Sequence, residues 1–337
     1  MPVNHPAFRV AAVQAAPIFL DLNATIDKAI ELIGQAAERG VNLVAFPENF
    51  FPGYPFFLWL GSPAWAMQFV QRYHDNSLII DSPEYERLAE AAKRFGVYLS
   101  FGFSEKSNGS LYMAQALIDD QGNTLSTRRK LKPTLVERSL FGEGDGSDLS
   151  VIDTALGKIG SLCCWEHIQP LTKYAMFGQH EQVHIGAWPS FSLYSGLAYA
   201  LGPEVNNAVT LTYAVEGQCF VVAPSSVVSE EMVEMLCHTD EAKRLLPAGG
   251  GHARLYGPDG SSLATPIPED VEGLLIGEVD LGLLSLSKFA ADPAGHYSRP
   301  DVTRLLLDKT PRRPVIITNR QEVEPSNPAP LSQDDQL

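Results

Sequence analysis

The segment that most constrains the fold runs from residue 151 to residue 177. Its first part predicts a strand, a two-residue turn and a second strand that ends near Cys164, and residues 171–177 predict a helix. Pro170 stands just before this helix, where a missing N–H does no harm. Cys164 is thus expected where a buried strand gives way to a turn, close to free backbone N–H groups that stabilise a thiolate nucleophile. The alternative is an inert cysteine buried in the core.

The rest of the chain alternates apolar runs with amphipathic stretches, which predicts an α/β layered sandwich with mixed sheets. The expected strands are residues 9–14, 41–46, 97–102, 111–119, 124–129, 185–189, 219–224, 253–256 and 273–279. The expected helices are residues 23–39, with Asn23 as the cap, 83–95, which Gly96 ends, and 206–216. Turn residues at 120–123 and 257–260 predict hairpins.

The composition argues against several classes of partner. With 25 Lys and Arg against 40 Asp and Glu, the formal net charge is -15, which disfavours nucleic acids and anionic membranes. Residues 49–71 carry no charge, but their prolines and glycines make a membrane-spanning helix improbable. The four cysteines show neither a disulfide framework nor zinc-ligand spacing, and residues 1–6 lack the start of a secretory signal. A reducing cytoplasm is the expected compartment.

Three polar residues fall at the predicted ends of strands. Glu48 follows the second apolar run, Lys130 follows the second strand of a hairpin, and Cys164 ends a third strand. Taken alone, Glu48 and Lys130 could be solvated surface charges. The combination is more specific, because a thiol nucleophile needs a base and its anionic intermediate needs a cation.

The motifs around these three residues resemble those of one known family. They are Pro47-Glu48, Arg129-Lys130-Leu131-Lys132-Pro133-Thr134 and Cys164-Trp165-Glu166-His167, together with Asp292-Pro293-Ala294-Gly295-His296-Tyr297-Ser298. On these motifs the chain resembles the nitrilase branch of the carbon–nitrogen hydrolase superfamily. The resemblance covers residues 8–302, and it implies a four-layer α-β-β-α sandwich with mixed sheets over that domain. Residues 303–337 are expected to form a C-terminal extension that becomes disordered toward its end.

The resemblance also implies a catalytic set, residue by residue. Cys164 matches the nucleophile, Glu48 the general base, and Lys130 the cation that stabilises the tetrahedral intermediate. Glu137 matches a second glutamate that positions the lysine, and its alternative is a surface loop acid. Cys163 stands where many relatives have asparagine, so the doublet leaves some ambiguity, although only the second cysteine aligns with the motif. Because Glu48 would face Lys130, each should favour the charged form of the other.

The implied reaction is hydrolysis of a nitrile to a carboxylic acid and ammonia through a thioimidate and a thioester, without a metal or an organic cofactor. Aromatic residues near the catalytic positions in sequence, and one proline, could line the pocket or belong to the core. They are Tyr54, Trp59, Phe141, Trp165, Trp188, Pro189 and Phe191. Segments 163–165, 188–195 and 216–220 are similar to arylacetonitrilases, which implies substrates such as phenylacetonitrile or mandelonitrile. The alternatives are an aliphatic or aromatic nitrilase, a cyanide-degrading relative or an amidase.

A metalloprotease and a non-catalytic protein are the alternatives to a nitrilase from other classes. His180-Glu181-Gln182-Val183-His184 fits the zinc-protease pattern, with Glu204 downstream as a third ligand. That site needs both histidines on one long helix, whereas residues 185–188 predict a buried strand, so we expect buried hydrogen bonds there instead. A non-catalytic protein that keeps the fold would lack a catalytic residue, and none of the family's positions is empty.

The resemblance further implies self-association into dimers and longer spirals. Two segments suit such contacts: the uncharged stretch 54–69, rich in Phe, Trp and Pro, and residues 229–246, where Met232, Met235 and Leu236 recur at helical spacing. The first stretch would leave a large apolar patch if it stayed exposed, and its alternative is to fold inward and line the pocket. We predict a homo-oligomer of at least a dimer, with residues 325–337 outside the folded core.

Overall fold

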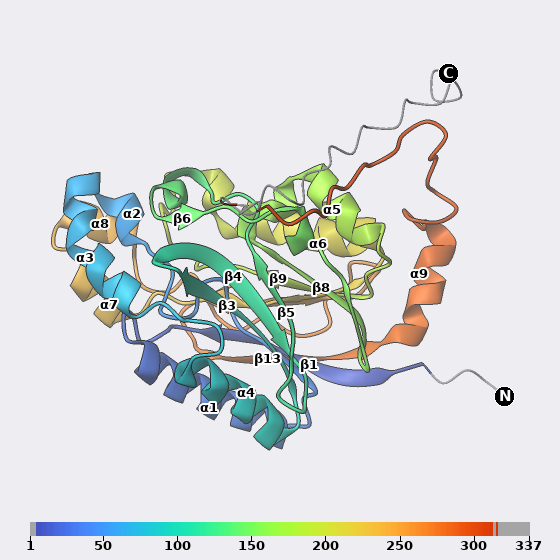
Figure 1. Ribbon diagram of the computed structural model, residues 1–337, viewed down its shortest axis with the longest axis horizontal. Coiled ribbons are helices and arrows are strands. Elements are labelled where there is room, and N and C mark those ends of the chain that lie inside the picture. Colours follow the sequence, from blue (N-terminus) through green and yellow to red (C-terminus); the bar gives the residue numbers. More distant parts are fainter. Residues whose placement is uncertain (1–4, 313–314, 316–337) are drawn as a thin grey trace, which may run out of the picture.

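The structure is a computed structural model that describes residues 5–312 and 315, and it stacks two β-sheets between outer layers of helices (Figure 1). The eight-stranded sheet contains, in spatial order, β11 (Ser225–Ser226), β1 (Ala7–Ala15), β2 (Leu43–Ala45), β3 (Tyr98–Ser107), β4 (Ser110–Ile118) and β5 (Thr124–Arg129), with β13 (Gly273–Asp280) beside β1 and β6 (Phe141–Gly142) beside β4. The five-stranded sheet contains β12 (Arg254–Tyr256), β10 (Phe220–Ala223), β9 (Val183–Ala187), β8 (Gly157–Cys163) and β7 (Ile152–Thr154). Both sheets mix parallel and antiparallel pairs.

Three apolar layers hold the stack together. One lies between the first sheet and the helices α1 (Leu22–Glu38) and α4 (Pro83–Phe95), and one lies between the two sheets. The third lies between the second sheet and the helices α5 (Pro170–Phe177) and α6 (Pro203–Gly217). Strand β1 has an unbroken apolar sequence because both of its faces are buried: Ala11 and Val13 face the helices, and Val10 and Ala12 face the other sheet. The predicted four-layer α-β-β-α sandwich with mixed sheets is confirmed.

The helix boundaries follow the capping residues. Helix α4 has the predicted bounds, because Ser82 caps its start and Gly96 ends it in the left-handed conformation. The cap predicted for α1 was wrong: Asp21, not Asn23, accepts from the Ala24 N–H at 3.0 Å. Helix α6 begins at Pro203, three residues before the predicted start, because proline is favourable in the first helical turn.

Strand β3 continues five residues past Gly102, where the sequence predicted its end. This glycine does not break the strand. It leaves room for the turn after β2, because a Cβ at Gly102 would lie 2.4 Å from the carbonyl oxygen of Pro47 and 2.8 Å from the Cα of Glu48. The close approach fixes the start of the Glu48 turn against the sheet.

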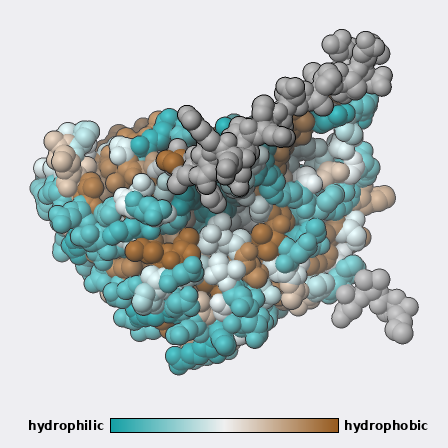
Figure 2. Space-filling model, viewed as in Figure 1, coloured by the Kyte–Doolittle hydropathy of each residue, from teal (hydrophilic) through white to brown (hydrophobic). Residues whose placement is uncertain are grey.

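The two segments predicted to make intermolecular contacts pack on each other within the chain. The first forms α2 (Phe57–Leu60) and α3 (Pro63–Asp75), and the second forms α7 (Glu230–Leu236) and α8 (Asp240–Leu245). Phe57, Phe69, Met232 and Leu236 share one buried cluster, so most of the aromatic stretch folds inward. Other large apolar side chains do reach the surface, and Figure 2 shows apolar patches between hydrophilic residues on one face of the molecule.

The C-terminal part of the chain continues from α9 (Leu284–Ala290) and returns along the second sheet's side of the molecule (Figure 1). Leu305 and Leu307 pack against the apolar layer under α5 and α6, and the backbone N–H of Arg312 donates to Asp145 at 2.6 Å. Residues 325–337, predicted to lie outside the core, fall beyond the residues that the structure describes. Within residues 5–312, none of the helices has both the length and the apolar composition that crossing a membrane requires.

Candidate active site

Glu48, Lys130 and Glu137 meet in one buried cluster of charges. Strands β2 and β5 run in the same direction in the first sheet, so the residues that follow them reach the same edge. The ammonium nitrogen of Lys130 lies 2.8 Å from Oε1 of Glu48 and 2.9 Å from Oε2 of Glu137. All three residues are 1% exposed, so the lysine is a buried cation held between two carboxyl groups.

Glu137 belongs to a short 3-10 helix, Leu135–Ser139, which follows the Lys130 strand end. Its carboxylate also accepts from the backbone N–H of Thr134, which closes a capping box, and from the hydroxyl of Tyr54 at 2.5 Å. The hydroxyl of Tyr54 in turn accepts from the indole N–H of Trp59 at 3.1 Å. The burial of Glu137 excludes the surface-acid alternative, and Tyr54 fixes the orientation of this carboxylate.

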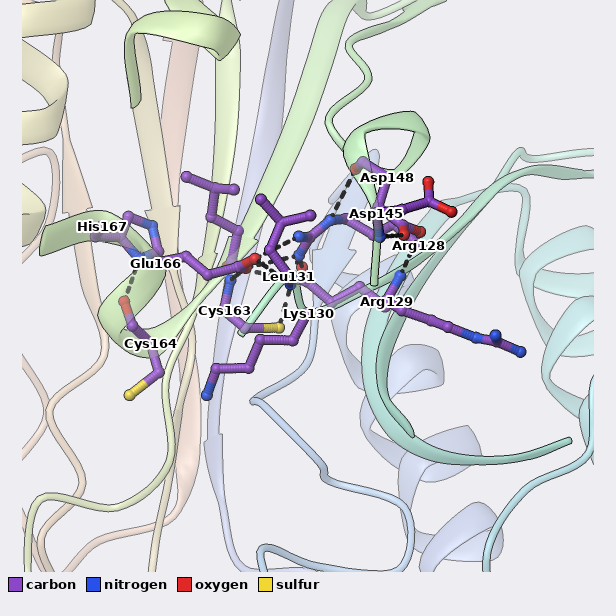
Figure 3. A network of polar contacts seen from close by, with 12 residues as sticks. Arg128, Arg129, Lys130, Leu131, Asp145, Asp148, Cys163, Cys164, Glu166 and His167 are labelled. Atoms are coloured by element: carbon purple, nitrogen blue, oxygen red, sulfur yellow. Dashed lines mark hydrogen bonds and ion pairs between the residues drawn. The ribbon is translucent and has the colours of Figure 1, made fainter. Parts of the chain in front are cut away.

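Cys164 is the first residue after β8 and opens a 3-10 turn, Cys164–Ile168. Its φ of 47° lies in the left-handed region, which non-glycine residues seldom occupy, so the surrounding structure must hold the turn. The side chain borders a cavity that Glu137 also lines, and Cys164 is 9% exposed whereas Cys163 is fully buried. Figure 3 shows the two thiols pointing in opposite directions, and the sulfur of Cys163 lies 3.9 Å from Arg128.

Glu166 ties the cysteine turn to the Lys130 strand end. Its carboxylate accepts two hydrogen bonds from the Arg128 guanidinium, at 2.9 and 2.7 Å, in the bidentate geometry that favours such pairs (Figure 3). It also accepts from the backbone N–H of Cys163 at 2.7 Å and of Leu131 at 2.8 Å. Burial acts to raise the pKa of Glu166, but Arg128 outweighs it and holds that pKa below the ordinary value. The Glu166 carboxylate thus binds the residue before Cys164 and the residue after Lys130, and so fixes the position of one relative to the other.

The prediction that Glu48 and Lys130 each favour the charged form of the other is confirmed, but burial decides the net shift at Glu48. Burial acts to lower the pKa of Lys130, but Glu137 and Glu48 together raise it well above the ordinary value. Burial raises the pKa of Glu48 to about 7, because Lys130 only partly offsets the loss of water and Glu137 adds repulsion. Oε2 of Glu48 finds no hydrogen-bond partner within the described part of the chain, so one oxygen remains available to take a proton.

The stabilisation of a thiolate by a backbone N–H, predicted for Cys164, is present but does not decide the pKa of this thiol. Burial and the charge of Glu48 raise the pKa of the thiol well above its ordinary value, although Lys130 and the backbone N–H of Trp165 act in the opposite direction. The resting side chain is therefore a neutral thiol, and it needs a base to become a nucleophile.

The cavity beside Cys164 has a volume of about 40 Å³, well below the roughly 300 Å³ at which ligand pockets usually begin. Of the residues proposed as its lining, the structure places these around it: Tyr54, Trp59, Trp165, Pro189 and Phe191. Phe141 instead packs against Tyr73, and Trp188 stacks on His167 behind the cysteine turn. The sequence did not indicate Phe56, Thr134, Ser190, Leu193, Leu201 and Asn206, which complete the lining. Thr134, Ser190 and Leu193 lie inside segments quoted for the resemblance, and Phe56 lies in the stretch 54–69, so these four carried a usable signal.

Phe191 borders both this small cavity and a larger one of about 400 Å³. The second cavity is lined mainly by polar and small residues of the segment 192–204, and by His252 and Glu269, which lie 3.3 Å apart. The aromatic ring of Phe191 packs between Trp188 on one side, at 5.5 Å between centroids, and His252 on the other, at 5.8 Å. The side chain of Phe191 is therefore part of the wall that both cavities share.

The segment with the zinc-protease pattern does not form a helix. His184 is the second residue of β9, and His180 lies on the surface before that strand. Glu181 and His184 make buried hydrogen bonds, as predicted. Across residues 5–312, no group of three His, Cys, Asp or Glu side chains is arranged to hold a metal ion.

Comparisons with known proteins agree with this geometry. Residues 9–289 match the family model described as "Carbon-nitrogen hydrolase". A solved carbon–nitrogen hydrolase from Helicobacter pylori G27 superposes with a TM-score of 0.69 at 18% identity, covering 88% of this chain and 97% of that one, which supports the fold. The chain belongs to the carbon–nitrogen hydrolase family.

The curated relatives narrow the class. The chain is 58% identical to a nitrilase of Pseudomonas syringae pv. syringae (strain B728a) over 91% of this chain and 92% of that protein. It is 50% identical to "Nitrilase, arylacetone-specific" of Alcaligenes faecalis, over 94% and 88%, and 50% identical to an aliphatic nitrilase of Rhodococcus rhodochrous, over 91% and 84%. Within its family the chain is a nitrilase, a hydrolase that acts on the carbon–nitrogen bonds of nitriles.

Proposed function

We propose that the nitrile is hydrolysed by Cys164, Glu48, Lys130 and Glu137 acting together. The observation that carries the proposal is that Cys164 and Glu137 border one cavity, while Lys130 joins Glu137 to Glu48 by hydrogen bonds of 2.9 and 2.8 Å. A thiol with a raised pKa beside a carboxylate whose pKa lies near 7 is the arrangement that general-base catalysis needs at neutral pH.

The steps follow from these roles. Ionised Glu48 takes the proton of the Cys164 thiol as the sulfur adds to the nitrile carbon, and this proton moves to the nitrile nitrogen to give a thioimidate. Water adds to the thioimidate, ammonia leaves, and a thioester remains. A second water then releases the carboxylic acid and restores the thiol. Lys130 stabilises the negative charge that develops at each tetrahedral stage, and Glu137 keeps the ammonium in position.

The proposed substrates are arylacetonitriles such as phenylacetonitrile or mandelonitrile. Support comes from the aromatic lining of the cavity by Tyr54, Trp59, Trp165 and Phe191, which suits stacking against an aryl group. The small volume favours a second candidate, a short aliphatic nitrile, and one of the relatives at 50% identity is an aliphatic nitrilase. Ammonia release from phenylacetonitrile, benzonitrile, butyronitrile and phenylacetamide distinguishes these candidates, and a preference for butyronitrile or the amide would contradict the aryl proposal.

The assignment of the nucleophile has a matched test in the cysteine pair. Cys164→Ala is expected to abolish turnover, whereas Cys163→Ala is expected to keep a substantial fraction, because the Cys163 thiol points away from the cavity toward Arg128. Mass spectrometry with a slowly hydrolysed nitrile should find the adduct on Cys164 alone. An active Cys164→Ala protein beside a folded, inactive Cys163→Ala protein would reverse the assignment.

We further propose that the hydrolase domain covers residues 8–302, with 303–337 as its extension, and that the protein forms homo-oligomers. Exposed apolar side chains on and near helices α5, α6 and α9 support self-association, notably Leu171, Tyr199, Leu286 and Phe289.

The four cysteines are free and buried, which suits the reducing cytoplasm proposed for this protein.

A further inference from the structure

Behind the cysteine turn lies a chain of four buried polar side chains that the proposed mechanism does not use. Nδ1 of His167 lies 2.6 Å from the carbonyl oxygen of Cys164, and Nε2 of His167 lies 2.8 Å from Nε2 of His184. Nδ1 of His184 lies 2.8 Å from Oε1 of Glu181, whose Oε2 accepts from the hydroxyl of Tyr213 at 2.6 Å. The two histidines and Tyr213 are fully buried, and Glu181 is 1% exposed.

The position of each proton in this row of hydrogen bonds can be assigned by starting at the Cys164 carbonyl. The Cys164 carbonyl can only accept, so Nδ1 of His167 carries hydrogen. A neutral His167 then accepts at Nε2, and His184 must donate from its own Nε2. A neutral His184 accepts at Nδ1, which leaves Glu181 as the donor. The carboxyl group must therefore hold a proton on Oε1, while Oε2 accepts from Tyr213.

The alternative places the same proton on His184 and leaves Glu181 as a carboxylate. The surroundings disfavour it, because both groups are buried and charged forms lose their hydration there. Among the described residues, Glu181 is faced by His184 from β9, Tyr213 from α6 and the thiol of Cys219, while β8 and α5 contribute a glycine and the methyl group of Met176. Burial raises the pKa of Glu181 to about 8 and lowers that of His184 well below its usual range, in agreement with a neutral pair.

Close packing leaves this arrangement little freedom to change. The ring of His184 stacks on Tyr213 with 3.7 Å between centroids, and the ring of His167 stacks on Trp188 at 5.1 Å. A Cβ at Gly160 would lie 2.0 Å from Oε1 of Glu181, so only glycine leaves room for this carboxyl group beside β8.

We propose that protonated Glu181, acting through His184 and His167, fixes the carbonyl of Cys164 and so aims the thiol at the nitrile. Cys164 needs such support because its backbone lies in the left-handed region. Glu166 holds the N–H of the preceding residue, and the Glu181 chain holds the carbonyl on the other side of the nucleophile. All four members of the chain are positioning residues, since none belongs to the charge cluster that handles the reacting atoms. The aim of the thiol rests on the proposed role of Cys164, but the protonation of Glu181 does not.

Glu181→Gln tests the proton directly, because an amide N–H can donate to His184 while the amide oxygen accepts from Tyr213. This variant is expected to fold and to keep kcat within about threefold, since it reproduces every bond of the protonated acid. A folded variant that loses about a hundredfold in kcat, or one that fails to fold, would overturn the assignment, because both results mean that the carboxylate charge is needed.

The stability of the same variant gives a readout that does not involve catalysis. A carboxyl group whose pKa rises from 4.5 to about 8 on folding stabilises the protein fully below pH 4.5, and this contribution is lost as pH rises toward 8. The Tm of Glu181→Gln relative to the unmodified protein is therefore expected to rise between pH 5 and 8. Glu31→Gln, on the exposed face of α1, is the control and should show a constant difference. A constant difference for Glu181→Gln as well would refute the buried proton.

His167 supplies a matched pair for the aim of the thiol. In His167→Asn the amide nitrogen occupies the position of Nδ1 and can still donate to the Cys164 carbonyl, whereas His167→Phe cannot, and both lose the bond to His184. The phenylalanine variant is expected to lose on the order of a hundredfold in kcat with KM little changed, because a misaimed thiol alters the reaction more than binding. The kcat of the asparagine variant should be at least tenfold higher than that of the phenylalanine variant. Equal kcat in the two variants would sink the positioning role, whereas an active Cys164→Ala protein would instead sink the proposed nucleophile.

Discussion

Replacing Lys130 by methionine separates the charge of this residue from its shape. The apolar stem remains, but the carboxyl groups of Glu48 and Glu137 then lie in one buried site without the cation that joins them. Two such groups cannot both stay ionised, so one proton is retained and the pKa of Glu48 rises further above about 7. The variant thus loses the cation that stabilises the intermediate and, at neutral pH, most of its base.

The size of the loss follows from these two effects. Removing one group that stabilises a developing anion usually lowers kcat by about 10²- to 10³-fold, and losing a general base costs about 10²- to 10⁴-fold. Groups that act as a unit are not additive, so the expected decrease is at least about 10³-fold rather than the product. Breaking a buried ion pair costs about 3–5 kcal/mol of stability, and the proton taken up by the carboxyl pair reduces that cost here.

Ammonia release from phenylacetonitrile measures the activity, and a thermal melt followed by circular dichroism shows whether the variant folds. Lys132→Met is the matched control, because this lysine lies two residues further on, is 61% exposed in its side chain, and pairs with Glu143 at the surface. Such a surface pair contributes about 0–1 kcal/mol, so the control should have nearly unchanged activity and Tm. A Lys130→Met protein with turnover within tenfold of the unmodified enzyme, or a control damaged to the same extent, would refute the reasoning.

Three further predictions concern pH, pocket size and assembly. Glu48 must be ionised to act as the base, so kcat/KM should increase as pH rises through about 7, and a flat profile from pH 5 to 8 would contradict its role. Phe191→Ala joins the two cavities, so kcat/KM for naphthylacetonitrile relative to phenylacetonitrile should rise about tenfold, whereas Phe141→Leu, outside the lining, should leave that ratio unchanged. Light scattering of dilute enzyme should show at least a dimer, and a fully active monomer would exclude the proposed assembly.

The positions of the site residues along the chain could be predicted because they follow from strand ends. A charged residue directly after a predicted strand lies at a sheet edge: Glu48 follows the apolar run that contains β2, and Lys130 follows β5, the second strand of a hairpin. Helix α4 could be predicted to the residue because Ser82 and Gly96 carry their capping signals locally. The end of β3 could not, because Gly102 is required by a turn distant in sequence rather than by the strand itself.

The electrostatics of the site could not be predicted in the same way. A sequence shows which charges are near each other but not how much water each one loses, and burial decides the direction of the shift at Glu48 and at Cys164. The sequence likewise does not show which neighbouring residues line the pocket. Trp188 and Pro189 are neighbours in sequence, yet Pro189 borders the cavity and Trp188 stacks behind the cysteine turn, because successive side chains leave the backbone in different directions.

The site joins two sheets, and this explains the residues that follow the cysteine in its motif. Glu48 and Lys130 come from the first sheet and Cys164 from the second, while the Glu48 N–H donates to the carbonyl of Trp188 at 3.3 Å across the boundary. A misplacement of about one ångström between reacting groups costs roughly a hundredfold in rate, so the cysteine turn must be fixed relative to both sheets. Glu166 fixes it to the strand end of Lys130, and His167 fixes it to β9. The motif Cys-Trp-Glu-His therefore places the proposed nucleophile and both of its proposed supports within one turn of the chain.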